Sequence, residues 1–123
     1  MTVLSEKKGT FTIDAYIKKM GNDLLVVLSG GDIHIGAVGI AQPRPSLRNE
    51  SKISATSSVY TFLGHKEDVI VKPLSEELSK RLNKKVVVVA GLHWDRISNK
   101  EIDMVKRLCR KITQKIIKEV GQE

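Results

Sequence analysis

The spacing of apolar residues differs between the two halves of the chain, and this difference limits the folds that the sequence can adopt. In residues 11–17 apolar and polar side chains alternate at a period of two, and residues 54–63 alternate in the same way. In residues 102–120 the apolar side chains recur every three or four positions, which is the period of an α-helix. The chain therefore combines half-buried strands with an amphipathic helix.

Other segments extend this pattern. Leu24–Leu28 and Val86–Ala90 are apolar on both faces, which is typical of buried strands. Residues 34–41 continue the sheet and are expected to stop at the prolines that follow. The leucines of residues 74–82 have helical spacing, but Pro73 leaves the start of that helix open, because proline belongs in the first turn or kinks a helix.

The predicted order is ββββαβα, which gives an α+β fold with a largely antiparallel sheet and two helices packed on one face. Four consecutive strands suggest an antiparallel meander, and Ser98 to Glu101 reads as a capping box that starts the last helix. A length of 123 residues fits one domain, residues 1–123, with an ordered core over about 10–120. The sheet face without helices needs a cover, and a second copy of the chain predicts a homodimer.

Composition and charge narrow the class of protein. The net charge of +7 indicates an anionic partner, which is a nucleic acid, a phosphorylated small molecule or an acidic protein surface. The apolar runs are too short to cross a bilayer, and the N-terminus does not read as a secretory signal, so the expected location is the cytoplasm. Cys109 is the only cysteine and lies on the apolar stripe of the last helix, which predicts an inert core thiol.

Three histidines lie at or just beyond predicted strand ends: His34, His65 and His93. They meet in one pocket if those ends converge. His34 belongs to the glycine-rich segment 29–36, where backbone amides can approach an anion, although a plain β-turn explains the same residues. Trp94 either stacks on a planar ring or anchors its loop against the core.

Several common sites are not supported. The glycine-rich segment has neither the dinucleotide fingerprint nor the P-loop lysine, and the histidines lack a metal-ligand spacing such as HExxH, so no metal site is predicted. Ser54, Ser57 and Ser58 with His65 lack the nucleophile elbow of a hydrolase. The basic last helix has no nucleic-acid motif and few neighbouring aromatic residues, which favours a solvated cationic face over a nucleic-acid site.

Five segments taken in order carry a family resemblance: SGGDIHIG (29–36), QPRPSL (42–47), SATSSV (54–59), GHKED (64–68) and GLHWD (91–95). Over roughly residues 10 to 120 the chain resembles the prenylated flavin chaperone family called LpdD-like. The resemblance implies a fold like that of the proteasome assembly chaperones. It also implies a non-catalytic protein that binds prenylated flavin mononucleotide (FMN) and assists a UbiD-type decarboxylase.

A flavin nucleotide needs amides and cations for its phosphate and a flat apolar wall with a few hydrogen bonds for its ring. The residues expected at the phosphate are Gly30, Gly31, Arg44, Arg48 and Lys66. Those expected at the ring are His34, His65, His93 and Trp94, with Ser57 or Ser58 as hydrogen-bonding groups. Three alternatives stay open: a protein-assembly chaperone without a cofactor, a basic nucleic-acid-binding domain, and an enzyme that uses the histidines for acid–base chemistry.

Overall fold

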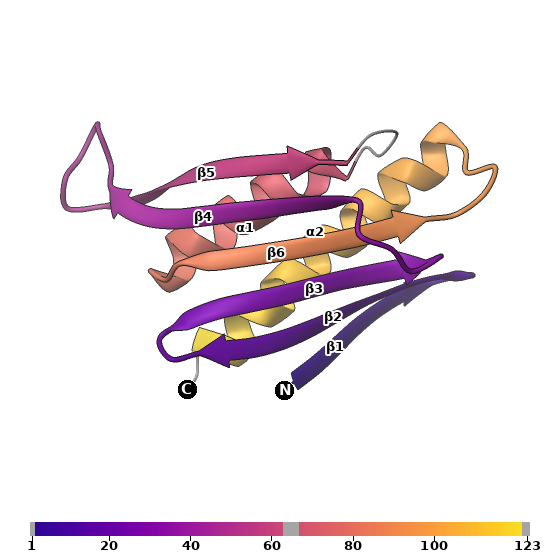
Figure 1. Cartoon of the computed structure of the whole chain (residues 1–123), viewed down its shortest axis with the longest axis horizontal. Helices are drawn as coiled ribbons and strands as arrows, with labels where there is room; N and C mark the ends of the chain where they lie inside the picture. Colours follow the sequence, from indigo (N-terminus) through magenta and orange to yellow (C-terminus); the bar gives the residue numbers. More distant parts are fainter. Residues whose placement is uncertain (1, 63–66, 122–123) are drawn as a thin grey trace.

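Six strands form one sheet in the spatial order β1, β2, β3, β6, β4, β5, and two helices lie along the same face of it (Figure 1). The computed structural model describes residues 2–62 and 67–121. The class is α+β, as predicted. In chain order the elements are β1 (Thr2–Lys8), β2 (Phe11–Met20), β3 (Asp23–Gly31), β4 (Ala37–Pro45), β5 (Ile53–Thr61), α1 (Asp68–Leu82), β6 (Val86–His93) and α2 (Asn99–Gly121).

Strand β6 lies between β3 and β4, parallel to β3 and antiparallel to β4. The predicted meander of four consecutive strands is therefore wrong at one place, because β3 and β4 are not neighbours. The cause lies in β6 itself, where Val86, Val88 and Ala90 are fully buried. A short strand that is apolar on both faces is most stable at the centre of a sheet, where both of its edges are paired.

One strand and the bounds of another also differ from the prediction. The edge strand β1, which carries charged residues and pairs antiparallel with β2, was not predicted. The third predicted strand, residues 34–41, lies further along the chain, because β4 begins at Ala37 and continues to Pro45. Beyond Ala41, β4 pairs with β5 but no longer with β6. One side of the strand is unpaired there, so the missing N–H groups of Pro43 and Pro45 are tolerated.

The helices cover the sheet with the apolar stripes that the sequence predicts. The capping box at the start of α2 is confirmed, because Glu101 N–H donates to Ser98 Oγ (3.1 Å) and Ser98 N–H donates to Glu101 Oε1 (3.0 Å). In α1, Pro73 lies in the second turn of a helix that begins at Asp68. The buried residues of α2 are Val105, Leu108, Cys109, Ile112, Thr113, Ile116 and Val120. In the described part of the chain, neither helix is both long enough and apolar enough to cross a membrane.

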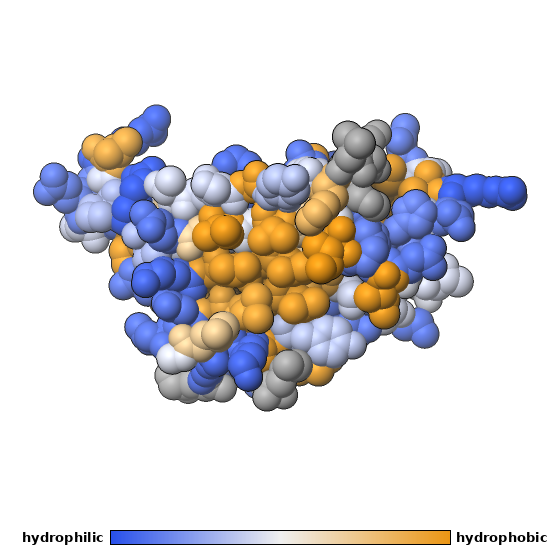
Figure 2. All heavy atoms as spheres, in the orientation of Figure 1, coloured by the Kyte–Doolittle hydropathy of each residue, from blue (hydrophilic) through white to orange (hydrophobic). Residues whose placement is uncertain are grey.

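The sheet face opposite the helices carries an apolar patch, here called the open face (Figure 2). The strand register aligns its side chains in rows that cross the sheet. Several of these side chains are strongly exposed, including Val3 at 52%, Ile40 at 54% and Tyr60 at 66%. The longest row runs Val3, Tyr16, Val27, Val89, Val38, Tyr60, and a second row beside it runs Leu25, Val87, Ile40.

Candidate functional site

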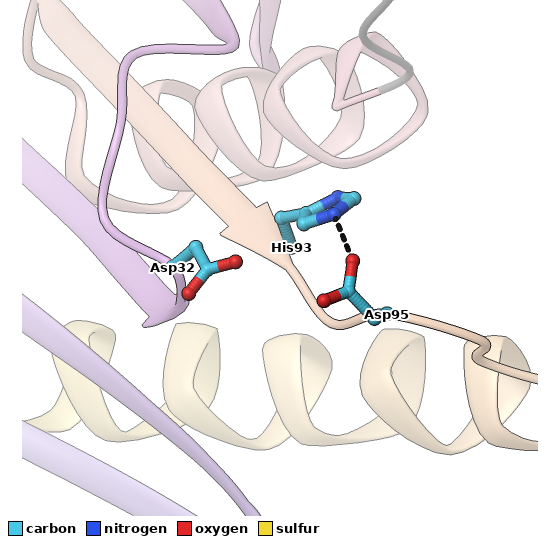
Figure 3. A group of neighbouring side chains, drawn as sticks. All are labelled: Asp32, His93 and Asp95. Atoms are coloured by element: carbon cyan, nitrogen blue, oxygen red, sulfur yellow. Dashed lines mark hydrogen bonds and ion pairs between the residues drawn. The ribbon is translucent and has the colours of Figure 1, made fainter.

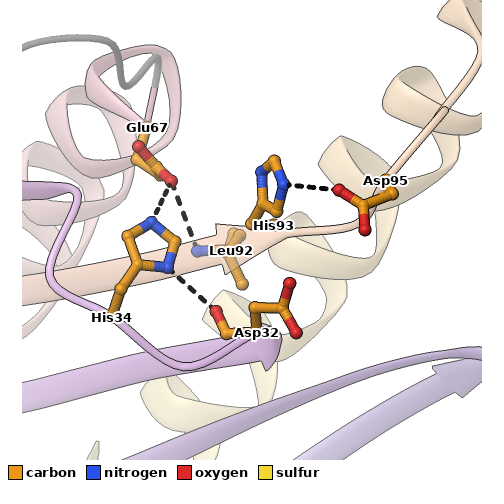
Figure 4. Close-up of polar contacts among 6 residues, drawn as sticks. All are labelled: Asp32, His34, Glu67, Leu92, His93 and Asp95. Atoms are coloured by element: carbon orange, nitrogen blue, oxygen red, sulfur yellow. Dashed lines mark hydrogen bonds and ion pairs between the residues drawn. The ribbon is translucent and has the colours of Figure 1, made fainter.

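The segment that joins β3 to β4 crosses the end of β6, because β6 lies between those two strands (Figure 4). Residues 32–36 make this crossing, and the backbone of His34 passes directly over Gly91. A Cβ atom at Gly91 would lie 2.6 Å from the carbonyl carbon of His34, so only glycine allows the approach. The topology thus places the glycine-rich segment and the GLHWD segment together.

His34 is held by two hydrogen bonds. Its Nδ1 donates to the backbone carbonyl of Asp32 at 2.9 Å, and its Nε2 lies 3.0 Å from Glu67 Oε1. Glu67 immediately precedes α1, is buried, and also accepts a bond from the Leu92 N–H at 3.4 Å. Both ring nitrogens of His34 therefore face oxygen atoms. Glu67 therefore ties the crossing segment, α1 and β6 to one another.

A second pair lies beside the first. His93, the last residue of β6, places Nε2 at 3.1 Å from Asp95 Oδ1. The rings of His34 and His93 meet edge to face with their centroids 6.3 Å apart. We call Asp32, His34, Glu67, His93 and Asp95 the polar cluster; its side chains come from three separate parts of the chain (Figure 4). The predicted convergence of strand-end histidines is present for His34 and His93.

An apolar cleft of about 400 Å³ opens beside the polar cluster, between the end of β6 and the first turns of both helices. Glu67 and His93 belong to both the cluster and the cleft wall. Most of the lining is apolar, and Lys106 adds a cation. The lining residues are Glu67, Val69, Ile70, Leu92, His93, Trp94, Ile97, Ile102, Val105 and Lys106. A second cleft of about 350 Å³ between α1 and α2 shares Val69, Ile70 and Lys106 with it.

Gly30 and Trp94 form one packing unit at this end of the sheet. A Cβ atom at Gly30 would lie 2.8 Å from Trp94 Cη2, so the missing side chain makes room for the indole ring. The ring also packs edge to face against Phe11, with centroids 5.2 Å apart. Trp94 therefore anchors its loop against the core and at the same time forms part of the cleft wall. Gly31 pairs with His93 in the register of β3 and β6.

The structure places the other predicted site residues elsewhere. Arg44 lies at the far end of β4 from the polar cluster, where its Nε donates to Thr56 Oγ1, and Arg48 lies in the loop beyond it. Ser57 lies under α1, donates to Glu76 Oε1 and accepts from Lys72 Nζ. Ser58 lies on the open face, paired with Ile40. None of these four shares the cleft with His93 and Trp94.

Two predicted residues, His65 and Lys66, lie outside the described residues. The sequence reading quoted Glu67 only as a neighbour of His65 and did not assign it to the site. A buried carboxylate indicates that another polar group lies close to it, because a charged side chain is rarely buried without a partner. That partner, His34, is 33 positions away in the sequence, so spacing alone could not identify it.

Cys109 is buried on α2, as its position on the apolar stripe predicts. Burial raises the pKa of the Cys109 thiol to about 12, so at neutral pH the thiol stays protonated. A protonated thiol is neither a nucleophile nor a metal ligand. Cys109 is therefore an inert core residue, although it lies along the floor of the cleft between α1 and α2.

The fold and the site together define a class: a small α+β protein with a six-stranded sheet, two helices on one face of it and a ligand-sized cleft at one end. A solved structure from yeast, described as a novel chaperone complex for 20S proteasome assembly, matches with a TM-score of 0.56 and 14% identity. The match covers 98% of this chain and 95% of the yeast chain, so the two share a fold.

The family follows from the sequence itself. The model of the prenylated flavin chaperone LpdD-like domain matches residues 7–121, and the chain belongs to this family. A comparison with the curated proteins found no match. The resemblance carried by the five motif segments is therefore confirmed, and the match over residues 7–121 agrees closely with the expected span of roughly 10 to 120.

Proposed function

We propose that this protein is a cofactor chaperone that binds prenylated FMN in the cleft beside the polar cluster and passes it to a UbiD-type decarboxylase. The observation that carries the proposal is the position of the cleft. Leu92, His93 and Trp94 of the GLHWD segment line it, and His34 of the glycine-rich segment contacts two of its lining residues, Glu67 and His93. These are two of the segments on which the family resemblance rests. The protein itself, on this proposal, holds the cofactor and performs no decarboxylation.

The chemistry of the cleft suits a flavin nucleotide. Sites for small molecules are typically about 300 to 1,000 Å³, mostly apolar, with a few placed polar groups. This cleft has about 400 Å³, an apolar wall that includes Trp94, and the polar groups of His93 and Lys106. The apolar wall suits the ring system, while the lysine ammonium and imidazole N–H groups suit carbonyl and phosphate oxygens.

Trp94 provides a direct assay, because it is the only tryptophan in the chain and lies on the cleft wall. Titration of the protein with FMN and with prenylated FMN is expected to quench Trp94 emission saturably, with tighter binding of the prenylated form. His34→Ala removes a bond to Glu67, and Ile102→Glu places a carboxylate beside the cleft; each is expected to weaken binding about tenfold or more. Ser58→Ala, on the open face, is the matched control and should leave the affinity unchanged.

Two results would contradict this assignment. The first is the absence of saturable quenching with either flavin. The second is quenching that the Ser58→Ala variant weakens as strongly as the His34→Ala variant does, because the ligand would then lie outside the cleft. Circular dichroism on each variant checks that the fold is intact.

We further propose that the functional unit is a homodimer in which a second copy covers the open face. The two apolar rows of that face carry no charged side chain at their centre, so a two-fold pairing of identical faces buries no unpaired charge. A partner with a charged surface would find no opposite charge at the centre of these rows. Oligomeric state in solution tests this: Val27→Glu, at the centre of the long row, should give monomers, whereas Leu47→Glu, exposed in the β4–β5 loop, should not.

A second candidate function is protein assembly without a cofactor, and it is favoured by the fold that this chain shares with the yeast chaperone complex for proteasome assembly. The same titration separates the two. Flavin binding at the cleft favours the cofactor chaperone, whereas a stable complex with a client protein in the absence of any flavin favours protein assembly.

A further inference from the structure

Three side chains of the polar cluster form a group of potential metal ligands: Asp32, His93 and Asp95 (Figure 3). His93 also lines the cleft. Each residue offers one ligand atom, and these three atoms all lie within 4.8 Å of one another. Octahedral coordination with bonds of about 2.1 Å places neighbouring donors about 3 Å apart and opposite donors about 4.2 Å apart. The three atoms therefore already lie close to the separations that a single ion requires.

The backbone holds the two contributing segments together. Gly31 pairs with His93 in the parallel register of β3 and β6, and the Asp32 N–H donates to the His93 carbonyl at 2.9 Å. Asp32 and His93 are thus fixed across neighbouring strand ends, and His93 Nε2 lies 3.1 Å from Asp95 Oδ1. Because these positions come from strand pairing, they do not depend on the ligand that the cleft holds.

The donor set has a recognisable chemistry. One imidazole nitrogen with carboxylate oxygens is a common combination for Mn²⁺, Fe²⁺, Co²⁺ and Zn²⁺. The side chains of His93 and Asp95 are 52% and 84% exposed, so an ion bound there keeps coordination positions open for water or for another oxygen. We propose that Asp32, His93 and Asp95 form a binding site for a divalent cation such as Mn²⁺.

The position of this site gives the cation a role, and this step rests on the proposed function. Asp32 and Asp95 place two carboxylates next to His93 of the cleft wall, and these repel the phosphate of a flavin nucleotide. A divalent ion neutralises the two carboxylates and so removes that repulsion, and its open coordination positions accept a phosphate oxygen, which adds an attraction. The cation therefore strengthens flavin binding in the cleft.

The metal site is tested first without any flavin. Mn²⁺ is titrated into the full chain. The electron paramagnetic resonance signal measures the free ion, and its loss measures the Mn²⁺ that is bound. The wild type is expected to bind one Mn²⁺ per chain at saturation. Asp32→Asn, His93→Ala and Asp95→Asn should each weaken binding by about tenfold or more, because each removes a ligand. Asp103→Asn, an exposed carboxylate on α2 outside the group, is the control and should bind as the wild type does.

A wild type that takes up Mn²⁺ weakly and without saturation, or variants that bind as the wild type does, would overturn the site. Trp94 quenching by flavin is then compared with and without Mn²⁺, using EDTA to remove the ion. Tighter flavin binding with Mn²⁺, lost in Asp95→Asn, is the expected result. Saturable Mn²⁺ binding without any flavin binding would leave the metal site standing and remove the proposed function, so the two failures are distinguishable.

Discussion

Gly91 lies where the crossing segment packs against β6. Its substitution is expected to disturb the polar cluster more than it disturbs the rest of the fold. In Gly91→Ala the new methyl group would lie 2.6 Å from the His34 carbonyl carbon and 3.1 Å from its amide nitrogen. Ordinary contacts begin at 3.4 Å and the His34 carbonyl oxygen is closer still than its carbon, so the segment has to move by more than about 0.8 Å. A shift of this size takes the 3.0 Å contact between His34 and Glu67 out of hydrogen-bonding range.

The expected cost follows from overpacking a buried position, which is typically about 1 to 3 kcal/mol. For a domain of this size that lowers the melting temperature by roughly 3 to 15 °C. Flavin affinity should fall more steeply than stability, by about tenfold or more, because the displaced segment carries the polar cluster. Thermal unfolding by circular dichroism and Trp94 quenching measure the two effects on the same variant.

Gly121→Ala is the matched control, because a methyl group there meets only the Leu82 side chain, at 3.9 Å. Replacing glycine by alanine in an unstrained helical position usually stabilises by about 0.4 to 1 kcal/mol, and flavin binding should not change. A Gly91→Ala protein with wild-type melting temperature and wild-type flavin affinity would refute the reasoning, since the crossing segment would then accommodate the methyl group without loss.

Three further predictions concern the scaffold. Ser98→Ala removes the acceptor of the Glu101 N–H and should cost about 1 kcal/mol by chemical denaturation at pH 7. The other arm of the capping box titrates: the bond from the Ser98 backbone N–H lowers the pKa of Glu101, so its stabilisation is present above the ordinary pKa of a glutamate and is lost as the pH falls through the lowered value, and a Glu101→Gln variant that is destabilised equally at pH 7 and pH 2.5 would contradict it. The Cys109 thiol should not react with a thiol reagent at neutral pH until denaturant is added, and rapid labelling of the native protein would be inconsistent with its burial. Leu78→Ala, at a fully buried position of α1, should cost about 2 to 5 kcal/mol, and a loss below 1 kcal/mol would mean that the helix packs less tightly than described.

Much of the fold was readable from local pattern. The α2 stripe, the capping box and the buried run of β6 follow from periodicity and residue type, which act within a few positions of the chain. The order of the strands did not follow, because β6, with its buried Val86 and Val88, lies between β3 and β4 only by pairing both of its edges with strands distant in the sequence. Such long-range competition between sheet positions leaves no local signal, and the polar edge strand β1 left only a weak one.

The site, like the fold, was predictable from the sequence only where the signal is local. His34, His93 and Trp94 could be selected from the sequence because they follow strand ends and glycines. Their partners could not: Glu67 meets His34, and Asp32 meets His93, only because the crossing segment passes over β6. Arg44 has the right chemistry for a phosphate but lies at the opposite end of β4, a separation that follows from the antiparallel pairing of β4 with β6.

The central claim is that the chain carries a flavin cofactor to an enzyme, and transfer tests it most directly. The protein is loaded with prenylated FMN, mixed with a UbiD-type decarboxylase that lacks its cofactor, and the appearance of decarboxylase activity is compared with that produced by the same concentration of free cofactor. We expect faster activation by the loaded chain, movement of the flavin to the decarboxylase on a sizing column, and loss of the advantage in His34→Ala. Activation no faster than with free cofactor would contradict the claim.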